Sequence, residues 1–416
     1  MESQGDIQER VLIVSQTFPP ASGIGGRRWA KFAKYLRKAG NEVEVISAQL
    51  PASSGQSWME DVEGIKQYHY EHKYPSILSQ NPRSIFQKIR YRFALARALF
   101  KADGTPYDRA IYDEKAFLEV LESRLKEFKP QTLIVTSPPV NLVFYAAKIR
   151  NQYPGVKFIA DFRDPWLDGN YYGYANLRPK ALKAEKAKEA FVVQQFDKIV
   201  SVSPWSLVLA GLTDRYPESA SKFELLPHGW DRDDVLGSGK QNVEVDMIYG
   251  GNLYKGFEPL LGFLARYAND KNIKVEVYSS SEVPEQALRT EGNFKIRNAI
   301  PVSDFFARIR QSEQLLLLIP KGAENGFSTK VLEFAAAGKG IIAVGYPGTL
   351  SELIVEKCLG SFVALDRLEE DFDNARKVLS KLRPDRKWIE DHEISRITEG
   401  LQRIIKELNV NRGAEK

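Results

Sequence analysis

The sequence predicts an α/β protein made of two Rossmann-like domains. A buried strand pattern at residues 11–15 runs through a glycine-rich loop into a helix, and residues 42–48 have the pattern of the next strand. Residues 245–249 start a second strand–loop succession, and residues 323–344 form a loop–helix–strand pattern. A chain of 416 residues with 43% hydrophobic content is long enough to bury two cores.

The composition excludes several classes of protein. The 59 basic and 54 acidic residues leave a net charge of +5, which is too small to indicate a nucleic-acid binder. The single cysteine, Cys358, excludes a disulfide framework and a cysteine-rich metal site, and it fits a reducing compartment. Residues 1–6 are polar and the longest apolar run, 315–319, is far too short to span a bilayer. We therefore expect a cytoplasmic protein that at most lies on the inner face of the membrane.

In the first domain, residues 19–28 form a glycine-containing loop ahead of a helix that closes on Gly40. Gly25 and Gly26 would let the backbone approach a phosphate, and Arg27 or Arg28 could supply positive charge. The spacing differs from the dinucleotide fingerprint, so an ordinary surface loop is the alternative.

A basic amphipathic helix is predicted over residues 83–101. From His72 to Ala102 the chain has no acidic residue. The apolar side chains of one helical stripe are Phe86, Ile89, Phe93, Ala96 and Phe100. Such a helix can contact anionic lipid or a partner, which would suit an enzyme with a lipid-linked acceptor. The alternative is a core-packing helix with a solvated basic back.

Polar residues follow two predicted strands, at 132–136 and 157–161. Asp161, Arg163 and Asp164 lie at the carboxyl end of the second strand, where parallel sheets bind ligands. The alternative is an arginine–aspartate pair that braces the loop. The next loop is aromatic, and Trp166 and Tyr171 could stack on an acceptor sugar, although a packed loop explains them equally well.

The second domain contains the most informative stretch, residues 323–344. Ser328 is a good N-cap, so the first free N–H groups of the helix would face an anion, to which Lys330 adds a full charge. Glu333, about one turn later, could accept hydrogen bonds from a ribose diol. An ordinary crossover with a capped helix is the alternative. We find no metal-ligand grouping; the aspartates of residues 231–234 read as a solvated run.

Several segments together resemble retaining glycosyltransferases of the GT-B fold, in particular a bacterial subgroup of glycosyltransferase family 4. They are the glycine loop, "DFRDPW", "HGWD", "GGNLYKG" and "GFSTKVLEFAAAGKGIIA". The resemblance implies two Rossmann-like domains facing a central cleft, with the C-terminal helix crossing back to the N-terminal domain. The corresponding ranges are an acceptor domain at 1–221, a linker at 222–242, a donor domain at 243–383 and a returning helix at 384–416.

The resemblance also implies roles for individual residues. Asn325 stands where the family has an acid that contacts the donor sugar, and Arg163 stands where many relatives have a histidine. With Asp161 and Asp164, these are the expected catalytic residues. Donor contacts are expected from Gly25, Gly26, Arg28, Asn252, Lys255, Gly326, Phe327, Ser328, Thr329, Lys330 and Glu333. Trp166 and Tyr171 are the expected acceptor contacts.

The implied reaction moves a sugar from a nucleotide-diphosphate donor, with UDP favoured, to a hydroxyl of a saccharide or lipid-linked acceptor. It proceeds with retention and needs no metal or cofactor, and bacterial surface polysaccharide or glycolipid assembly is the family's commonest context. Two alternatives stay open. One is a sugar-nucleotide 2-epimerase of the same fold. The other is a catalytically silent sugar-nucleotide-binding partner protein, because Asn252 and Asn325 occupy usually charged positions.

Overall fold

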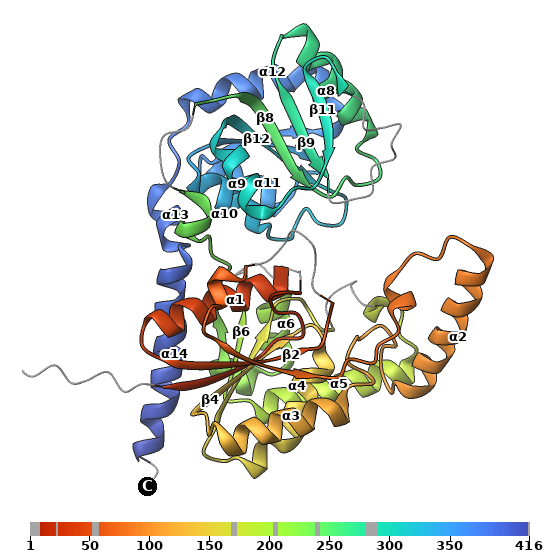
Figure 1. Cartoon of the computed structure of the whole chain (residues 1–416), viewed down its shortest axis with the longest axis vertical. Coiled ribbons are helices and arrows are strands. Elements are labelled where there is room, and N and C mark those ends of the chain that lie inside the picture. Colours follow the sequence, from red (N-terminus) through yellow and green to blue (C-terminus); the bar gives the residue numbers. More distant parts are fainter. Residues whose placement is uncertain are drawn as a thin grey trace, which may run out of the picture. The chain divides into compact units, whose positions relative to one another are not determined.

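The computed structural model describes residues 9–21, 24–51, 58–167, 173–202, 207–237, 242–279 and 290–414. The chain divides into two compact units. The first comprises Met1–Pro227 with Thr398–Lys416, and the second comprises His228–Ile397. Each unit is built on one seven-stranded sheet (Figure 1). Within the described ranges, no helix is both long and apolar enough to cross a membrane.

The first sheet is parallel throughout, with the order β3-β2-β1-β4-β5-β6-β7. Its strands are β1 (Arg10–Val14), β2 (Glu42–Ala48), β3 (Lys66–Tyr70), β4 (Thr132–Ser137), β5 (Lys157–Phe162), β6 (Lys198–Ser201) and β7 (Phe223–Leu225). The central strands are buried along almost their whole length, as expected for a parallel sheet covered on both faces. The edge strand β7 lies inside the range predicted as linker, 222–242.

The helices of the first unit cover this sheet on both faces, except for α2 (Ile85–Lys101), which packs on the segment after β3. They are α1 (Ile24–Lys38), α2, α3 (Glu114–Glu127), α4 (Val140–Ile149), α5 (Pro179–Gln195), α6 (Leu207–Arg215) and the first unit's part of α14 (Ile394–Ala414). Figure 1 shows α3, α4 and α5 together along one side of the sheet. Leu12 and Val14 of β1 pack into their cluster, while Val11 and Ile13 are buried on the opposite face. This alternation follows from the period of two in a strand.

The second sheet has the order β10-β11-β9-β8-β12-β13-β14, parallel except for the β10–β11 pair. Its strands are β8 (Val245–Gly251), β9 (Val275–Ser279), β10 (Thr290–Glu291), β11 (Phe294–Asn298), β12 (Ser312–Ile319), β13 (Gly340–Gly345) and β14 (Gly360–Ala364). In β12, Leu316 and Leu318 join one core cluster, whereas Leu315 and Leu317 join the other. The second domain is therefore a sheet between two helical layers.

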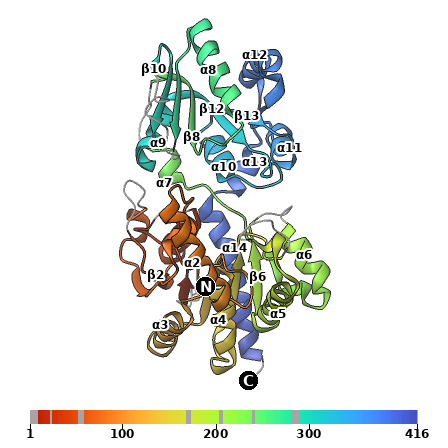
Figure 2. The same cartoon turned by 90° about the vertical axis from the view of Figure 1, so that its right-hand side faces the viewer.

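The helices of these layers are α7 (Arg232–Val235), α8 (Glu258–Asp270), α9 (Val302–Arg310), α10 (Thr329–Ala336), α11 (Thr349–Glu356), α12 (Leu368–Val378) and α13 (Arg386–Asp391). Figures 1 and 2 both show α8 and α12 on one side of the sheet and α10 and α11 on the other. Asp231, at the start of the predicted solvated acidic run, accepts the N–H of Asp233 and caps α7.

The C-terminal tail forms two helices, α13 and α14. The spacing of its apolar residues alone does not indicate that the helix is interrupted. The helix is interrupted between them because the His392 carbonyl accepts the N–H of Trp230 and the N–H of Ile394 donates to the Trp230 carbonyl. From Thr398 onward, α14 belongs to the first unit, where Leu401, Ile404 and Ile405 are buried. Asn409 Nδ2 donates to Glu9 Oε2 at 3.0 Å within that unit. The expectation that the last helix returns to the N-terminal domain is confirmed.

Candidate functional site

The first unit gathers polar side chains where β4 and β5 end, and Asp161 lies at their centre. Its carboxylate accepts hydrogen bonds from Trp29 Nε1 at 2.7 Å, Thr136 Oγ1 at 3.0 Å and Arg28 Nη2 at 3.2 Å. The side chain is 0% exposed. A buried carboxylate with three donors has no face left for a substrate. Asp161 therefore anchors α1 to the sheet, and its expected catalytic contact stays a prediction.

Arg28 is also buried. Besides its ion pair with Asp161, its guanidinium donates to the carbonyl oxygens of Leu226 at 2.7 Å and Pro227 at 2.8 Å. Burial lowers the pKa of Arg28, and the charge of Asp161 opposes that shift. Because these partners occupy the guanidinium, Arg28 fastens α1 to the chain after β7. The expected donor contact by Arg28 stays a prediction.

Arg163 lies beside the glycine loop at the start of α1. Its Nε donates to Thr136 Oγ1 at 3.0 Å and its Nη2 donates to the Pro138 carbonyl at 2.9 Å. Among the described residues, Nη1 has no hydrogen-bond partner, and it lies against the Cα of Gly25 in the first turn of α1. A Cβ at Gly25 would overlap the guanidinium, so only glycine permits this approach. Gly26 likewise has no room for a side chain, because its Cβ would crowd the Thr17 carbonyl.

A pocket of about 120 Å³ opens beside Arg163 at the carboxyl ends of β1, β4 and β5. This is the edge at which parallel α/β sheets bind ligands. Arg163 and Asp164, both half-buried, contribute charge of opposite sign to its wall. The remaining lining residues are Gln16, Thr17, Asp108, Arg109, Ser137, Pro138, Pro139, Val140, Pro165 and Tyr174.

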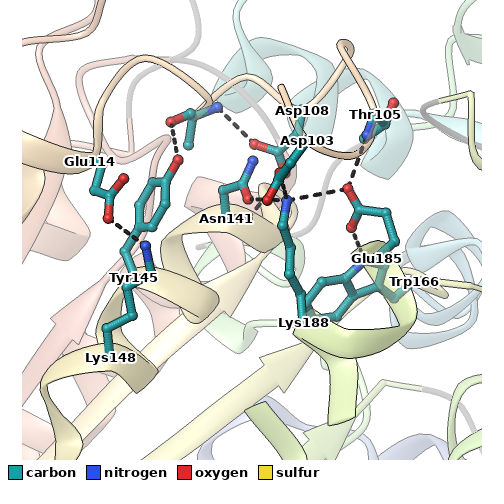
Figure 3. A network of polar contacts seen from close by, with 11 residues as sticks. Asp103, Thr105, Asp108, Glu114, Asn141, Tyr145, Lys148, Trp166, Glu185 and Lys188 are labelled. Atoms are coloured by element: carbon teal, nitrogen blue, oxygen red, sulfur yellow. Dashed lines mark hydrogen bonds and ion pairs between the residues drawn. The ribbon is translucent and has the colours of Figure 1, made fainter. Parts of the chain in front are cut away.

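Asp108 is a buried pocket residue that sequence reasoning missed. Its carboxylate accepts the backbone N–H groups of Ala110 at 2.9 Å and Asn141 at 3.2 Å, and so holds the N-terminus of α4 (Figure 3). Burial raises the pKa of Asp108 to about 6. The local sequence carries no signal for this role, because Asp108 lies in a turn distant from any predicted strand end.

Figure 3 shows the network behind this pocket, in which Lys188 meets three acceptors. Its ammonium lies 2.6 Å from Asp103 Oδ1, 3.3 Å from Asn141 Oδ1 and 3.5 Å from Glu185 Oε1. Glu185 in turn accepts the indole N–H of Trp166 at 2.9 Å. Trp166 is 2% exposed and packs edge-on against Phe162.

Trp166 is buried and its N–H is already engaged inside the protein, and its expected stacking on an acceptor stays a prediction. Its role is to hold the loop after β5 against the core. Tyr171, the other expected acceptor contact, lies outside the described residues.

The second unit brings Lys330 and Gly251 together. Lys330 lies in the first turn of α10, and its ammonium rests against the Cα of Gly251 at the end of β8, where a Cβ would overlap it. It stands 5.5 Å from the centre of the Tyr249 ring. No hydrogen bond or ion pair joins it to another described residue. Burial lowers the pKa of Lys330, and Glu333 opposes the shift.

Helix α10 begins where the sequence predicted it, directly after Ser328. Ser328 is the N-cap residue as expected, although its side chain makes no capping hydrogen bond. Val331 N donates to the Ser328 carbonyl at 3.1 Å, so Thr329 and Lys330 supply the preceding N–H groups of the turn. Glu333 follows one turn later and is 7% exposed.

The loop before α10 is held by α11. Asn325 Oδ1 accepts the backbone N–H of Thr349 at 3.2 Å and its hydroxyl at 3.4 Å. Gly326 N donates to the Ala323 carbonyl at 3.0 Å, and Phe327 packs half-buried against the core. Asn325 thus has a structural partner at the N-terminus of α11, and its predicted sugar contact stays a prediction.

The turn after β8 contains the two remaining expected donor residues, Asn252 and Lys255, both exposed. The Asn252 carbonyl accepts the hydroxyl of Tyr249 at 2.5 Å. Lys255 makes no ion pair or hydrogen bond within the described part of the chain. The structure therefore brings Gly251, Lys330 and Glu333 to one end of the second sheet and leaves Lys255 on the adjacent surface turn.

Three of the solved structures that resemble this chain align with it over nearly its whole length. The glycosyltransferase from Rickettsia africae aligns over 96% of this chain and 98% of its own with 16% identity and a TM-score of 0.61. HepE from Anabaena, solved with UDP and glucose, aligns over 96% and 100% with 10% identity and a TM-score of 0.57. The UDP-GlcNAc 2-epimerase of Methanocaldococcus jannaschii aligns over 96% and 100% with 9% identity and a TM-score of 0.53.

No family model matches the chain, and a search of curated proteins also finds no match. Two observations determine the fold class. The chain consists of two α/β units with largely parallel sheets, and it aligns with these structures over nearly its whole length. The chain has the GT-B fold of two Rossmann-like domains.

Proposed function

We propose that this protein is a glycosyltransferase whose second domain binds a nucleotide-diphosphate sugar. One observation carries the proposal: the half-buried Lys330 ammonium lies at the first turn of α10 against Gly251, with no ion-pair partner among the described residues. A buried charge without a partner is costly, and an anionic ligand would compensate it. The N–H groups of the same turn favour an anion at that place.

The same arrangement suits the leaving group of sugar transfer. Negative charge accumulates on the diphosphate as the bond to the sugar breaks, and Lys330 with the α10 N–H groups would stabilise it. We infer that this charge removes the need for a metal ion. Glu333, on the same face of α10, would accept hydrogen bonds from the ribose. HepE, solved with UDP and glucose, favours UDP as the nucleotide.

On the acceptor side, we propose that the pocket beside Arg163 and Asp164 receives the hydroxyl-bearing substrate. Arg163 Nη1 is available for a polar ligand, whereas Asp108 is occupied by two backbone N–H groups. If the leaving phosphate accepts the proton of the acceptor hydroxyl, the reaction needs no carboxylate base. A reaction of this kind favours retention at the sugar carbon. Assembly of a bacterial surface polysaccharide or glycolipid rests on the family resemblance.

A 2-epimerase is the second candidate, because the enzyme from M. jannaschii shares the fold over nearly the whole chain. The two reactions differ in a directly measurable way. Epimerisation exchanges the C2 proton of the sugar with solvent and needs no acceptor. Sugar transfer leaves that proton in place and releases nucleoside diphosphate only with an acceptor or slowly to water.

The proposal is tested by thermal-shift screening of the full chain with UDP, GDP, ADP, dTDP, CDP and their common sugars. A ligand at about a hundred times its Kd stabilises by roughly 2.7 kcal/mol. The donor that shifts the melting temperature is then incubated in D₂O with acceptor extracts, and NMR follows C2 deuteration and the anomeric configuration of any product. Binding with neither reaction would indicate a silent partner protein, and no binding would refute the proposed donor site.

A further inference from the structure

Helix α2 presents its large apolar side chains to solvent. Phe100 is 94% exposed, Phe86 76% and Phe93 67%. Ile85, Ile89 and Leu99 are also more than half exposed. Six of the fifteen exposed large hydrophobic side chains among the described residues therefore lie on this one helix. Isolated exposed apolar residues are ordinary, but a contiguous patch marks an interaction surface.

The opposite face of α2 attaches the helix to its domain. Ala94 and Ala98 are buried with Tyr74, Leu78 and Ile111. At about 100° per residue, the exposed phenylalanines lie about 120° around the helix from these alanines, and Ile85 and Ile89 lie on the far side. Small residues at the contact let α2 pack closely while its large side chains point outward. Figure 1 shows α2, in orange, standing out from the rest of the first unit.

The N-terminus of α2 is well defined. Ser84 Oγ accepts the N–H of Gln87 at 3.2 Å, and Gln87 Oε1 accepts the N–H of Ser84 at 3.1 Å, which completes a capping box. Gln87 Oε1 also accepts the N–H of Arg83 at 2.8 Å. The capping box therefore fixes the start of α2 in the structure, next to its exposed apolar face.

Basic side chains border the apolar face on both sides. With about 100° between successive residues, Lys88 falls at one border with Arg92 just inside it, and Arg90, Arg97 and Lys101 fall along the other border. All five are exposed, and none forms an ion pair with another described residue. No acidic residue occurs between His72 and Ala102 to neutralise them.

We propose that α2 is a membrane-docking helix that lies flat on an anionic lipid bilayer. The apolar face, defined as Ile85, Phe86, Ile89, Phe93, Leu99 and Phe100, would enter the boundary between headgroups and acyl chains. The bordering lysines and arginines would contact lipid phosphates from both sides. This surface shares no residue with either polar site, and its binding to lipid does not depend on the proposed sugar transfer.

Two other occupants fit less well. A second copy of the chain would bring two strongly basic helices together, and like charges oppose that contact. A nucleic acid would pair with the basic borders, but the aliphatic Ile85, Ile89 and Leu99 offer nothing for stacking. Hydrocarbon accepts aliphatic and aromatic side chains alike, which favours lipid.

Flotation of the full chain with vesicles tests the proposal. One set contains phosphatidylcholine alone and the other contains about one-third phosphatidylglycerol. The protein should float with anionic vesicles and bind neutral ones much more weakly, and high salt should reduce binding. The variant Phe86→Ser/Phe93→Ser/Phe100→Ser should bind more than about tenfold more weakly. Replacing Arg90, Arg97 and Lys101 by Gln should weaken binding on the order of a hundredfold, at about fivefold per charge.

The matched control is Val355→Ser/Val378→Ser, which removes two exposed apolar side chains from α11 and α12 and should leave flotation unchanged. Because the replaced phenylalanines are exposed, the triple variant should melt at the wild-type temperature. The proposal is overturned if the wild type fails to float, or if the phenylalanine variant floats equally well. A protein that does not float but forms dimers or binds RNA through the same phenylalanines would also overturn it.

Discussion

Replacing Lys330 with Met should weaken nucleotide binding without harming the fold. Methionine keeps the length of the side chain and removes only its charge. The ammonium lies against Gly251 without an ion-pair partner among the described residues, so its removal breaks no such contact there. Both expected effects follow from this one buried charge.

The effect on stability has a definite sign. Burial lowers the pKa of Lys330 below its usual 10.5, so the folded chain holds this proton less tightly than the unfolded chain. Below the folded pKa the buried charge therefore costs stability. As pH rises from the folded pKa towards 10.5, the folded chain loses the proton first and stability rises. Lys330→Met should lack this rise and, at neutral pH, should melt at or above the wild-type temperature.

The effect on binding has the opposite sign. A hydrogen bond between an ammonium and a phosphate contributes about 1.5–3 kcal/mol, so Lys330→Met should raise the Kd for UDP by about 10- to 150-fold. Uridine has no phosphate, so its weaker binding should not change. Isothermal titration calorimetry with both ligands gives the two constants on the same protein.

Lys381→Met is the matched control, because Lys381 is exposed and forms no ion pair with another described residue. It should leave both affinities and the melting temperature unchanged. An unchanged Kd for UDP in Lys330→Met would refute the reasoning. An equal loss for uridine would show that the substitution disturbs the domain generally, and the same conclusion would follow from a lower melting temperature.

Three further predictions test the same picture. Glu333→Ala should bind UDP and its 2′-deoxy analogue with similar Kd values, whereas the wild type prefers UDP roughly tenfold; an unchanged preference in titration calorimetry would sink the ribose assignment. Asp161→Asn should lower the free energy of unfolding by about 3–5 kcal/mol in urea titrations, because Arg28 keeps a buried charge without its partner. The half-buried Asp164→Asn should cost much less, and equal losses would contradict the anchor role. Asp108, with its pKa raised from 3.8 to about 6, holds its proton more tightly in the folded state, so its contribution to stability falls as pH rises between those values. Asp108→Asn should flatten that fall in urea midpoints measured across the interval, and an unaltered profile would exclude Asp108 as its source.

The sequence alone predicted strands correctly where the residues of the strand are buried and themselves have the pattern of a strand. Residues 42–48 were predicted as a strand and form β2 with the same bounds, because Val43, Val45 and Ile46 are β-branched and favour a strand. The edge strands β3 and β7 have the sequences KQYHY and FEL and were missed. Their own side chains do not show a strand pattern. They are strands because β3 pairs with β2 and β7 pairs with β6.

The candidate site also contains residues that the sequence could identify and residues that it could not. Lys330 and Glu333 could be selected from the sequence because a capped helix start and one helical turn relate them locally. Arg28 and Arg163 could not be distinguished, since each role depends on a residue far away in the chain. Asp161, 133 residues from Arg28, withdraws that arginine into the core, while Gly25 leaves room for Arg163.

Helix α2 marks the limit of what the sequence by itself determined. Its length, its basic character and its apolar stripe all follow from residues 83–101. Periodicity defines a face of a helix but not what covers that face. Only the tertiary structure decided that Ala94 and Ala98 pack inward and that the phenylalanines stay exposed. The reason is that burial depends on contacts with Tyr74, Leu78 and Ile111, which lie outside the helix.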